Sequence, residues 1–220
     1  MAELHGFAFT RFPCILKCMQ EEIEVKYLDV PHDEAQERLK RAGAVCKQQM
    51  RMMRRAIIDY PDRRLQTGLH GAWASVRVRD EGDRVTCTYK HVASDGKDSM
   101  HEIEFTVSSY ENAVELFKAI GLDVYTKQET KRETWQLGNV EIELDEWPWM
   151  PPYIEIEGPS EEDVRRTAEM LGYNFDKAFR GSSYTAYRMY YPKMSPEETV
   201  DSIKHLTFDG KLPQWLAERQ

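Results

Sequence analysis

The run Glu22-Ile23-Glu24-Val25-Lys26 decides how this chain is expected to fold. Charged and apolar residues alternate in it, and in a β-strand this alternation puts the three charges on one face and Ile23 and Val25 on the other. Adjacent charges on one strand are costly to bury, yet the same arrangement recurs along the chain. The sequence therefore predicts a sheet with one charged face and one apolar face.

The same alternation returns in later runs at residues 73–80, 84–91, 101–107, 140–145 and 153–157. With segments near 48–60 and 130–137, about eight short strands are expected, which favours an antiparallel sheet over a parallel α/β sheet. Glu-x-Glu occurs at 22/24, 102/104, 141/143 and 155/157. For a single strand, a half-exposed sheet explains the pattern. The repeated acidic pairs need a further explanation, because neighbouring carboxylates repel one another unless cations lie between them.

Helices are expected between and after these strands. The signals are a periodic run at 33–42 before Gly43, a capping box of Ser108 and Glu111, Ser160 with Asp163, Ser195-Pro196 with Glu198, and a short piece after Pro213.

Composition limits the class of protein. The 220 residues with 41% hydrophobic content suit one globular, soluble domain. The sequence contains no apolar run of about 18 residues, the length that would predict a membrane span. Four cysteines without a C-x-x-C pair indicate a reduced, cytoplasmic setting. The net charge of −8 argues against nucleic acid as a partner. Because basic residues nevertheless cluster between 51 and 79, any polyanion bound here is expected to be small and enclosed.

Polyphosphate chemistry needs both signs of charge in one place. Arginine offers a planar fork for phosphate oxygens, and lysine adds a point charge. Carboxylates hold a hard divalent cation that bridges to the phosphate, and Mg²⁺ or Mn²⁺ suits an all-oxygen site.

The order of these strands resembles a known family. The run at 22–26 matches the E-x-E-x-K signature of the CYTH superfamily, the triphosphate tunnel metalloenzymes, which include class IV adenylyl cyclases, thiamine triphosphatases and inorganic tripolyphosphatases. RRAIIDYPD at 54–62 looks like the family's second strand, ASVRVR at 74–79 like its R-x-R strand, TYK at 88–90 like its lysine strand and EIE at 102–104 like its central acidic strand. RETW at 132–135, VEIELD at 140–145 and YIEIE at 153–157 complete the series.

The resemblance implies an α+β fold, a closed eight-stranded antiparallel β-barrel tunnel with helices packed outside. It implies substrate-binding roles for Lys26, Arg77, Arg79, Lys90 and Arg132, and Lys177 is a further candidate that a surface role explains as well. The implied ligands of Mg²⁺ or Mn²⁺ are Glu22, Glu24, Glu104, Glu155 and Glu157. Glu22, Glu24, Lys26 and Asp145 form the expected catalytic group.

Two departures from the family bear on the substrate. Thr130-Lys131-Arg132 stands where the family often has Lys-x-Arg, which weakens the case for a cyclase. Trp147 and Trp149 lie in a proline-rich stretch that replaces a common glycine, and either ring could stack on an organic substrate or pack against the rim.

We therefore expect metal-dependent hydrolysis of a small-molecule triphosphate, either inorganic tripolyphosphate or an organic or nucleoside triphosphate. A class IV adenylyl cyclase, which converts ATP to cyclic AMP and pyrophosphate, is a close alternative. A non-catalytic polyphosphate- or nucleotide-binding module is a third. The expected division is an N-terminal extension or cloning remnant at 1–20, the tunnel domain at 21–190 and a helical tail at 191–220. A homodimer is a further option by analogy with some members of the family.

Overall fold

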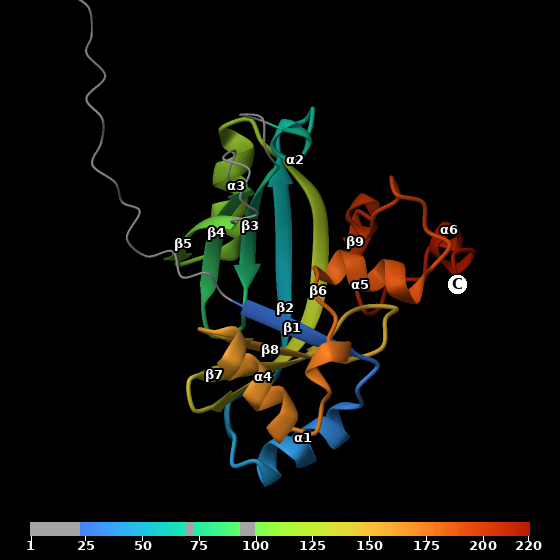
Figure 1. The fold of residues 1–220 in the computed structure, drawn as a ribbon. Coiled ribbons are helices and arrows are strands. Elements are labelled where there is room, and N and C mark those ends of the chain that lie inside the picture. The colour runs from blue at the N-terminus through green and yellow to red at the C-terminus, as the bar shows by residue number, and fades with distance from the viewer. Residues whose placement is uncertain (1–22, 69–72, 93–99) are drawn as a thin grey trace, which may run out of the picture.

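One curled sheet organises the chain (Figure 1). The structure is a computed structural model that describes residues 23–68, 73–92 and 100–220. Within these residues the strand order is β1 (Ile23–Leu28), β8 (Tyr153–Gly158), β7 (Val140–Glu146), β6 (Asp123–Leu137), β2 (Val45–Asp59), β3 (Ala74–Asp80), β4 (Val85–Val92) and β5 (Met100–Val107). All neighbours in this order are antiparallel, and the short β9 (His205–Leu206) lies parallel beside β6. The expected α+β fold with a large antiparallel sheet is confirmed.

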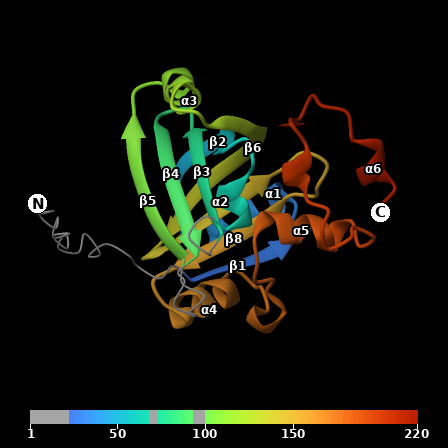
Figure 2. The ribbon, with the colours of Figure 1, turned by 90° about the horizontal axis from the view of Figure 1, so that it is seen from above.

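The expectation of a closed barrel is wrong. β1 and β5 are the two edges of the sheet, and no pairing joins them in the described ranges. Figure 2 shows the sheet curled instead, with β3, β4 and β5 on one flank and β8 and β1 on the other. Both edges carry acidic side chains on the concave face, Glu24 on β1 and Glu102 and Glu104 on β5, and like charges brought opposite one another across a strand pair are destabilising.

The apolar face of the sheet carries the core. Helices α1 (His32–Arg41) and α4 (Glu161–Met170) cover one half, where Val25, Ile142, Ile154 and Ile156 are fully buried. Helix α3 (Tyr110–Ala119) covers the other half, over a second cluster that includes Val78. Because the helices occupy this face, the charged residues of the same strands must point to the opposite, concave face.

Helix α4 follows the expected signals, since the Ser160 side chain accepts a hydrogen bond from the Asp163 amide at 3.1 Å. The cap of α3 is Ser109 rather than the expected Ser108, with the Asn112 amide as its donor at 3.1 Å. No helix begins at Ser195. The Glu198 side chain does accept from the Ser195 amide at 2.8 Å, as in a capping box, but it also pairs with Arg219 and the chain then turns away.

The remaining helical pieces are short. They are α2 (Arg64–Thr67), the 3₁₀ turns η2 (Phe175–Lys177) and η3 (Val200–Ser202), α5 (Ser183–Tyr190) and α6 (Gln214–Ala217). The last confirms the piece expected after Pro213. No helix in the described part of the chain has the length and apolar character needed to cross a membrane.

The C-terminal segment docks on β6. The Thr126 hydroxyl donates to the Ile203 carbonyl at 2.6 Å, and the Gln128 amide donates to Asp201 Oδ1 at 2.9 Å. Beneath it lies a third core cluster that contains Trp147, Tyr187 and Leu206. The tail therefore covers one end of the concave face.

Candidate functional site

Strand register places the charged residues side by side. Glu24 on β1 lies opposite Glu157 on β8, and Lys26 lies opposite Glu155. Glu155 in turn faces Glu143 on β7, while Asp145 on β7 faces Arg132 on β6. Since side chains that are paired across neighbouring strands point to the same face, these residues share the concave face.

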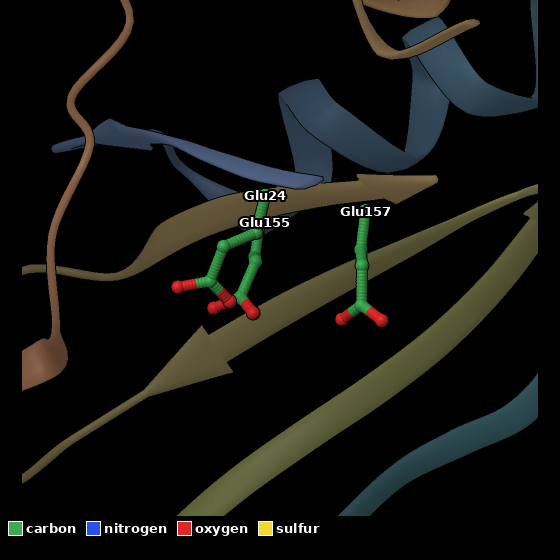
Figure 3. A group of neighbouring side chains, drawn as sticks. All are labelled: Glu24, Glu155 and Glu157. Carbon is green, nitrogen blue, oxygen red and sulfur yellow. The ribbon is translucent and has the colours of Figure 1, made fainter. Parts of the chain in front are cut away.

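Five carboxylates on β1, β7 and β8 form what we call the acidic flank: Glu24, Glu143, Asp145, Glu155 and Glu157. One group of possible ligand oxygens comes from Glu24, Glu155 and Glu157, which lie within 4.8 Å of one another (Figure 3). A second group comes from Glu143, Asp145 and Glu155 and meets the same limit. Glu155 belongs to both groups and so joins them.

Lys26 lies inside the first group. Its side chain is 4% exposed, and its ammonium is 2.7 Å from Glu24 Oε1 and 3.1 Å from Glu155 Oε2. Burial raises the pKa of the Glu24 carboxyl, but hydrogen bonding to Glu155 and the charge of Lys26 outweigh burial and hold that pKa below its usual value. Burial raises the pKa of Glu155 despite the same ammonium. Glu155 is therefore the member of the pair that retains a proton more readily.

Arg132 lies inside the second group. Its guanidinium makes a forked contact with Asp145, at 2.7 and 2.6 Å, and also pairs with Glu143. Burial, together with the charges of Asp145 and Glu155, raises the pKa of Glu143 well above its usual value although Arg132 opposes this. Within the acidic flank Lys26 pairs with Glu24 and Glu155, and Arg132 pairs with Glu143 and Asp145. The carboxylates of the flank are all-oxygen donors, which fit a divalent cation such as Mg²⁺ or Mn²⁺.

The other half of the curled sheet carries the basic flank on the same concave face. This flank consists of Arg77 and Arg79 on β3 and Lys90 on β4. Arg79 pairs at 2.6 Å with the buried Glu81, and Lys90 pairs at 2.8 Å with Glu102. Arg77 lies 3.6 Å from Glu104. Burial and the charges of Arg79 and Arg55 lower the pKa of Arg77 to about 9. An anion bound here would relieve this crowding of positive charge.

The two flanks influence one another across the concave face. The charge of Lys90 on β4 contributes to the lowered pKa of Glu24 on β1. Arg51 on β2 lies between the flanks, and its pKa responds to Glu81 on one side and to Arg132 and Glu143 on the other. The curled sheet therefore places acidic and basic groups around one space.

Not every predicted site residue joins this arrangement in the same way. Glu104 lies with Arg77 and accepts a hydrogen bond from Thr88 at 2.7 Å, so the structure places it apart from the acidic flank. Lys177 is exposed on η2, outside the sheet. Glu22 lies outside the described residues.

The tryptophans of the proline-rich stretch are packing residues. Trp147 is 4% exposed and lies in the third core cluster. Trp149 has a φ of 60° and donates from its indole nitrogen to the Gly210 carbonyl at 3.2 Å. Of the two roles that the sequence left open for these rings, the structure favours packing.

Four residues of the concave face were not singled out as site residues from sequence: Arg51, Arg55, Glu81 and Glu143. Glu143 shares its strand parity with Asp145, and the arginines belong to the basic run from 51 to 79, so a signal was present. Glu81 gave none, because a turn of Glu-Gly-Asp is expected to be exposed, whereas its side chain is 2% exposed and clamps Arg79 and Arg84.

Comparison with known proteins identifies one family whose model matches most of the chain. The model of the CYTH domain family matches residues 20–181. No curated protein matches the chain.

Solved structures share the fold at low sequence identity. A protein from Pyrococcus horikoshii is 23% identical, with a TM-score of 0.55 over 72% of this chain and 94% of its own. A candidate adenylate cyclase from Vibrio parahaemolyticus is 16% identical, with a TM-score of 0.63 over 76% of this chain and 97% of its own. A candidate adenylyl cyclase from Hippeastrum, described as having a dominant triphosphatase activity, is 15% identical, with a TM-score of 0.51 over 81% of this chain and 98% of its own.

Proposed function

The chain belongs to the CYTH domain family, and from this premise we propose that it hydrolyses a triphosphate with the help of a divalent cation. The observation that carries the proposal is the meeting of the acidic and basic flanks on one concave face. A surface of either sign alone would bind only a cation or only an anion. Both together suit a polyphosphate and the metal that accompanies it.

On this proposal the acidic flank holds the cation. Glu24, Glu155 and Glu157 are the nearest set of ligand oxygens, with Glu143 and Asp145 beside them. Mg²⁺ or Mn²⁺ held by these carboxylates would supply positive charge that stabilises the negative charge developing during phosphoryl transfer. Lys26 and Arg132 neutralise part of the charge of these carboxylates and so allow them to lie close together. Asp145 fixes the orientation of the Arg132 guanidinium.

The basic flank holds the anion. Arg77, Arg79 and Lys90 present their charges from adjacent strands, and each is already oriented by a carboxylate. Phosphoryl transfer asks for positioning and charge stabilisation more than for covalent help from the protein. Side chains held in this way meet that need without reorganising when the substrate arrives.

The cyclase alternative uses the same flanks but also needs a pocket that holds a base and a ribose. Three structural neighbours are described as candidate adenylate or adenylyl cyclases, which keeps this alternative second. Trp147 and Trp149 pack into the protein and therefore do not supply the stacking surface that would favour it.

Product analysis tests the proposal. The protein is incubated with tripolyphosphate, ATP and thiamine triphosphate, each with Mg²⁺ or Mn²⁺ and with EDTA as the control, and the products are separated. Hydrolysis predicts orthophosphate with the matching diphosphate. Cyclic AMP with pyrophosphate would instead identify a cyclase, and tight binding of triphosphate without turnover would identify a binding module.

A further inference from the structure

Arg55 lies on the concave face beside the basic flank. On β2 it is directly opposite Arg79 of β3 on one side and Gln128 of β6 on the other. The next inward position of β2, Ile57, lies opposite Arg77. Arg55 therefore extends the row of cations from β3 into the middle of the sheet.

The side chain of Arg55 is held in place without any carboxylate. Its Nε donates to Gln128 Oε1 at 2.8 Å, and its guanidinium carbon lies 4.2 Å from the centre of the Trp147 ring. Gln128 also donates to Asp201 of the C-terminal segment at 2.9 Å. These contacts orient the guanidinium without an ion pair, and the charge of Arg55 acts on the Asp201 carboxyl only by lowering its pKa in part.

The cations of the two flanks differ from Arg55 in this respect, because Arg77, Arg79, Lys90, Lys26 and Arg132 each form an ion pair. Arg51 resembles Arg55 in forming none within the described residues, but its guanidinium donates to the Arg132 carbonyl and the Thr134 hydroxyl. Among the described residues Arg55 forms none, and its Nη2 is buried without a hydrogen-bond partner. The charge of Arg55 also helps to lower the pKa of Arg77. A buried N–H without a partner in a crowd of like charges is unfavourable, and an anion would satisfy it.

We propose that Arg55 binds the phosphate of the triphosphate that lies farthest from the acidic flank, and so favours a triphosphate over a diphosphate. The inference rests on the proposed function. Arg55 is four residues from Arg51 along β2, which places their Cα atoms about 13 Å apart. Arg51 lies beside Arg132 and the acidic flank. A phosphate chain that begins at the acidic flank therefore reaches Arg55 only if it is long enough, and the planar guanidinium suits a terminal phosphate with its free oxygens.

Binding of two inorganic probes tests the proposal. Isothermal titration calorimetry with Ca²⁺, a hard cation with oxygen ligands that stands in for Mg²⁺ or Mn²⁺ at the acidic flank, measures the dissociation constants of tripolyphosphate and pyrophosphate, and product analysis of the cell contents checks that no tripolyphosphate is consumed. For Arg55→Gln we expect tripolyphosphate to bind about tenfold or more weakly, as for the loss of one charge-assisted contact. Pyrophosphate should change much less, so the preference for the longer chain should shrink.

Arg54→Gln is the matched control. Arg54 is the neighbour of Arg55 on the same strand, points to the other face and pairs with Asp80 and Glu111. It removes the same charge and should change the affinity for neither probe. Arg55→Lys, which retains the charge but not the fork, should lie between the wild type and Arg55→Gln and supports the test if the glutamine variant folds poorly.

The outcomes separate this inference from the proposed function. If the wild type binds neither probe, the proposed function fails together with the inference. If the wild type prefers tripolyphosphate and Arg55→Gln retains that preference unchanged, the role of Arg55 is overturned while the function stands. An equal loss of both probes would also overturn the proposed discrimination.

Discussion

Lys26 is the most enclosed cation of the site, and its surroundings explain how charges can be buried on this sheet. Its ammonium lies between Glu24 and Glu155, and the attraction of these carboxylates raises its pKa although burial opposes this. The three groups form a small network in which each charge is partly compensated. A cation held by the oxygens of Glu24, Glu155 and Glu157 would add positive charge to this network.

Glu24→Gln should abolish turnover while leaving the fold intact. The amide retains the shape of the carboxylate but loses the charge that would hold a cation, so we expect kcat to fall by about 100-fold or more. Steady-state kinetics with tripolyphosphate, beside a thermal unfolding curve, checks this. Glu115→Gln on the exposed surface of α3 is the control. Unchanged kinetics in Glu24→Gln would remove Glu24 from the site.

Arg132→Met should destabilise the protein, because it leaves Glu143 and Asp145 buried without their partner. Removing one member of a buried ion pair costs about 3–5 kcal/mol, and urea unfolding in EDTA measures it. Mn²⁺ should restore more stability to the variant than it adds to the wild type, since the cation can replace the lost guanidinium.

The double variant Arg132→Met with Glu143→Gln provides the control for that experiment. Removing one of the uncompensated carboxylates should recover part of the lost stability. If Mn²⁺ stabilises the wild type and Arg132→Met equally, the second acidic group does not hold the cation.

At the level of strands and helices, the C-terminal segment is more than a surface addition. Asp201 and Tyr184 come from η3 and α5, yet they form hydrogen bonds with one another beside Gln128 on the concave face. Burial raises the pKa of Asp201, and the hydrogen bonds with Tyr184 and Gln128 offset only part of this. Docking of this segment therefore buries the Asp201 carboxyl in surroundings that favour its protonated, neutral form.

Asp201→Asn should alter the pH dependence of stability. Because the folded-state pKa of Asp201 is raised, the wild type holds this proton more tightly when folded. Its stability therefore falls as the pH rises from the unfolded-state pKa, about 3.9, through the raised folded value. The asparagine variant lacks this decline, so its stability relative to the wild type should improve from pH 4 to pH 7. Urea unfolding across this range checks the sign, and a constant difference would contradict it.

For the whole molecule, the open sheet has a direct consequence. The edges β1 and β5 carry acidic side chains on the same concave face, and nothing in the described structure pairs them. A cation on the acidic flank and a polyanion on the basic flank would neutralise the charge of both flanks and link the two flanks to one another. Binding would then draw the edges together.

Hydrogen exchange followed by mass spectrometry can detect this closure. With Mg²⁺ and tripolyphosphate together, amide exchange should slow in both β1 and β5. The free energy of unfolding should rise by about 2.7 kcal/mol at a ligand concentration 100 times the dissociation constant. Either component alone should give a smaller effect. Slower exchange in β1 with no change in β5 would show that the ligand does not bridge the flanks.

Alternation along the chain was enough to predict most of the strands and the face on which each charge lies. The side-chain period of a strand is a local property of the backbone, so Glu24, Arg77 and Glu155 could be assigned to one polar face before any contact was known. The cap of α4 at Ser160 was predictable for the same reason. The chemistry of the charged residues, and the class of ligand that they suit, also followed from the sequence.

Only the tertiary structure decided which charges meet. Strand register pairs Arg132 with Asp145 and leaves Arg55 beside Gln128, and register depends on residues distant in the sequence. The same holds for the open edges, the buried Glu81 and the helix at α5 in place of one after Ser195. Local patterns state which side a residue faces, whereas burial, pairing and pKa depend on what the rest of the chain brings to that side.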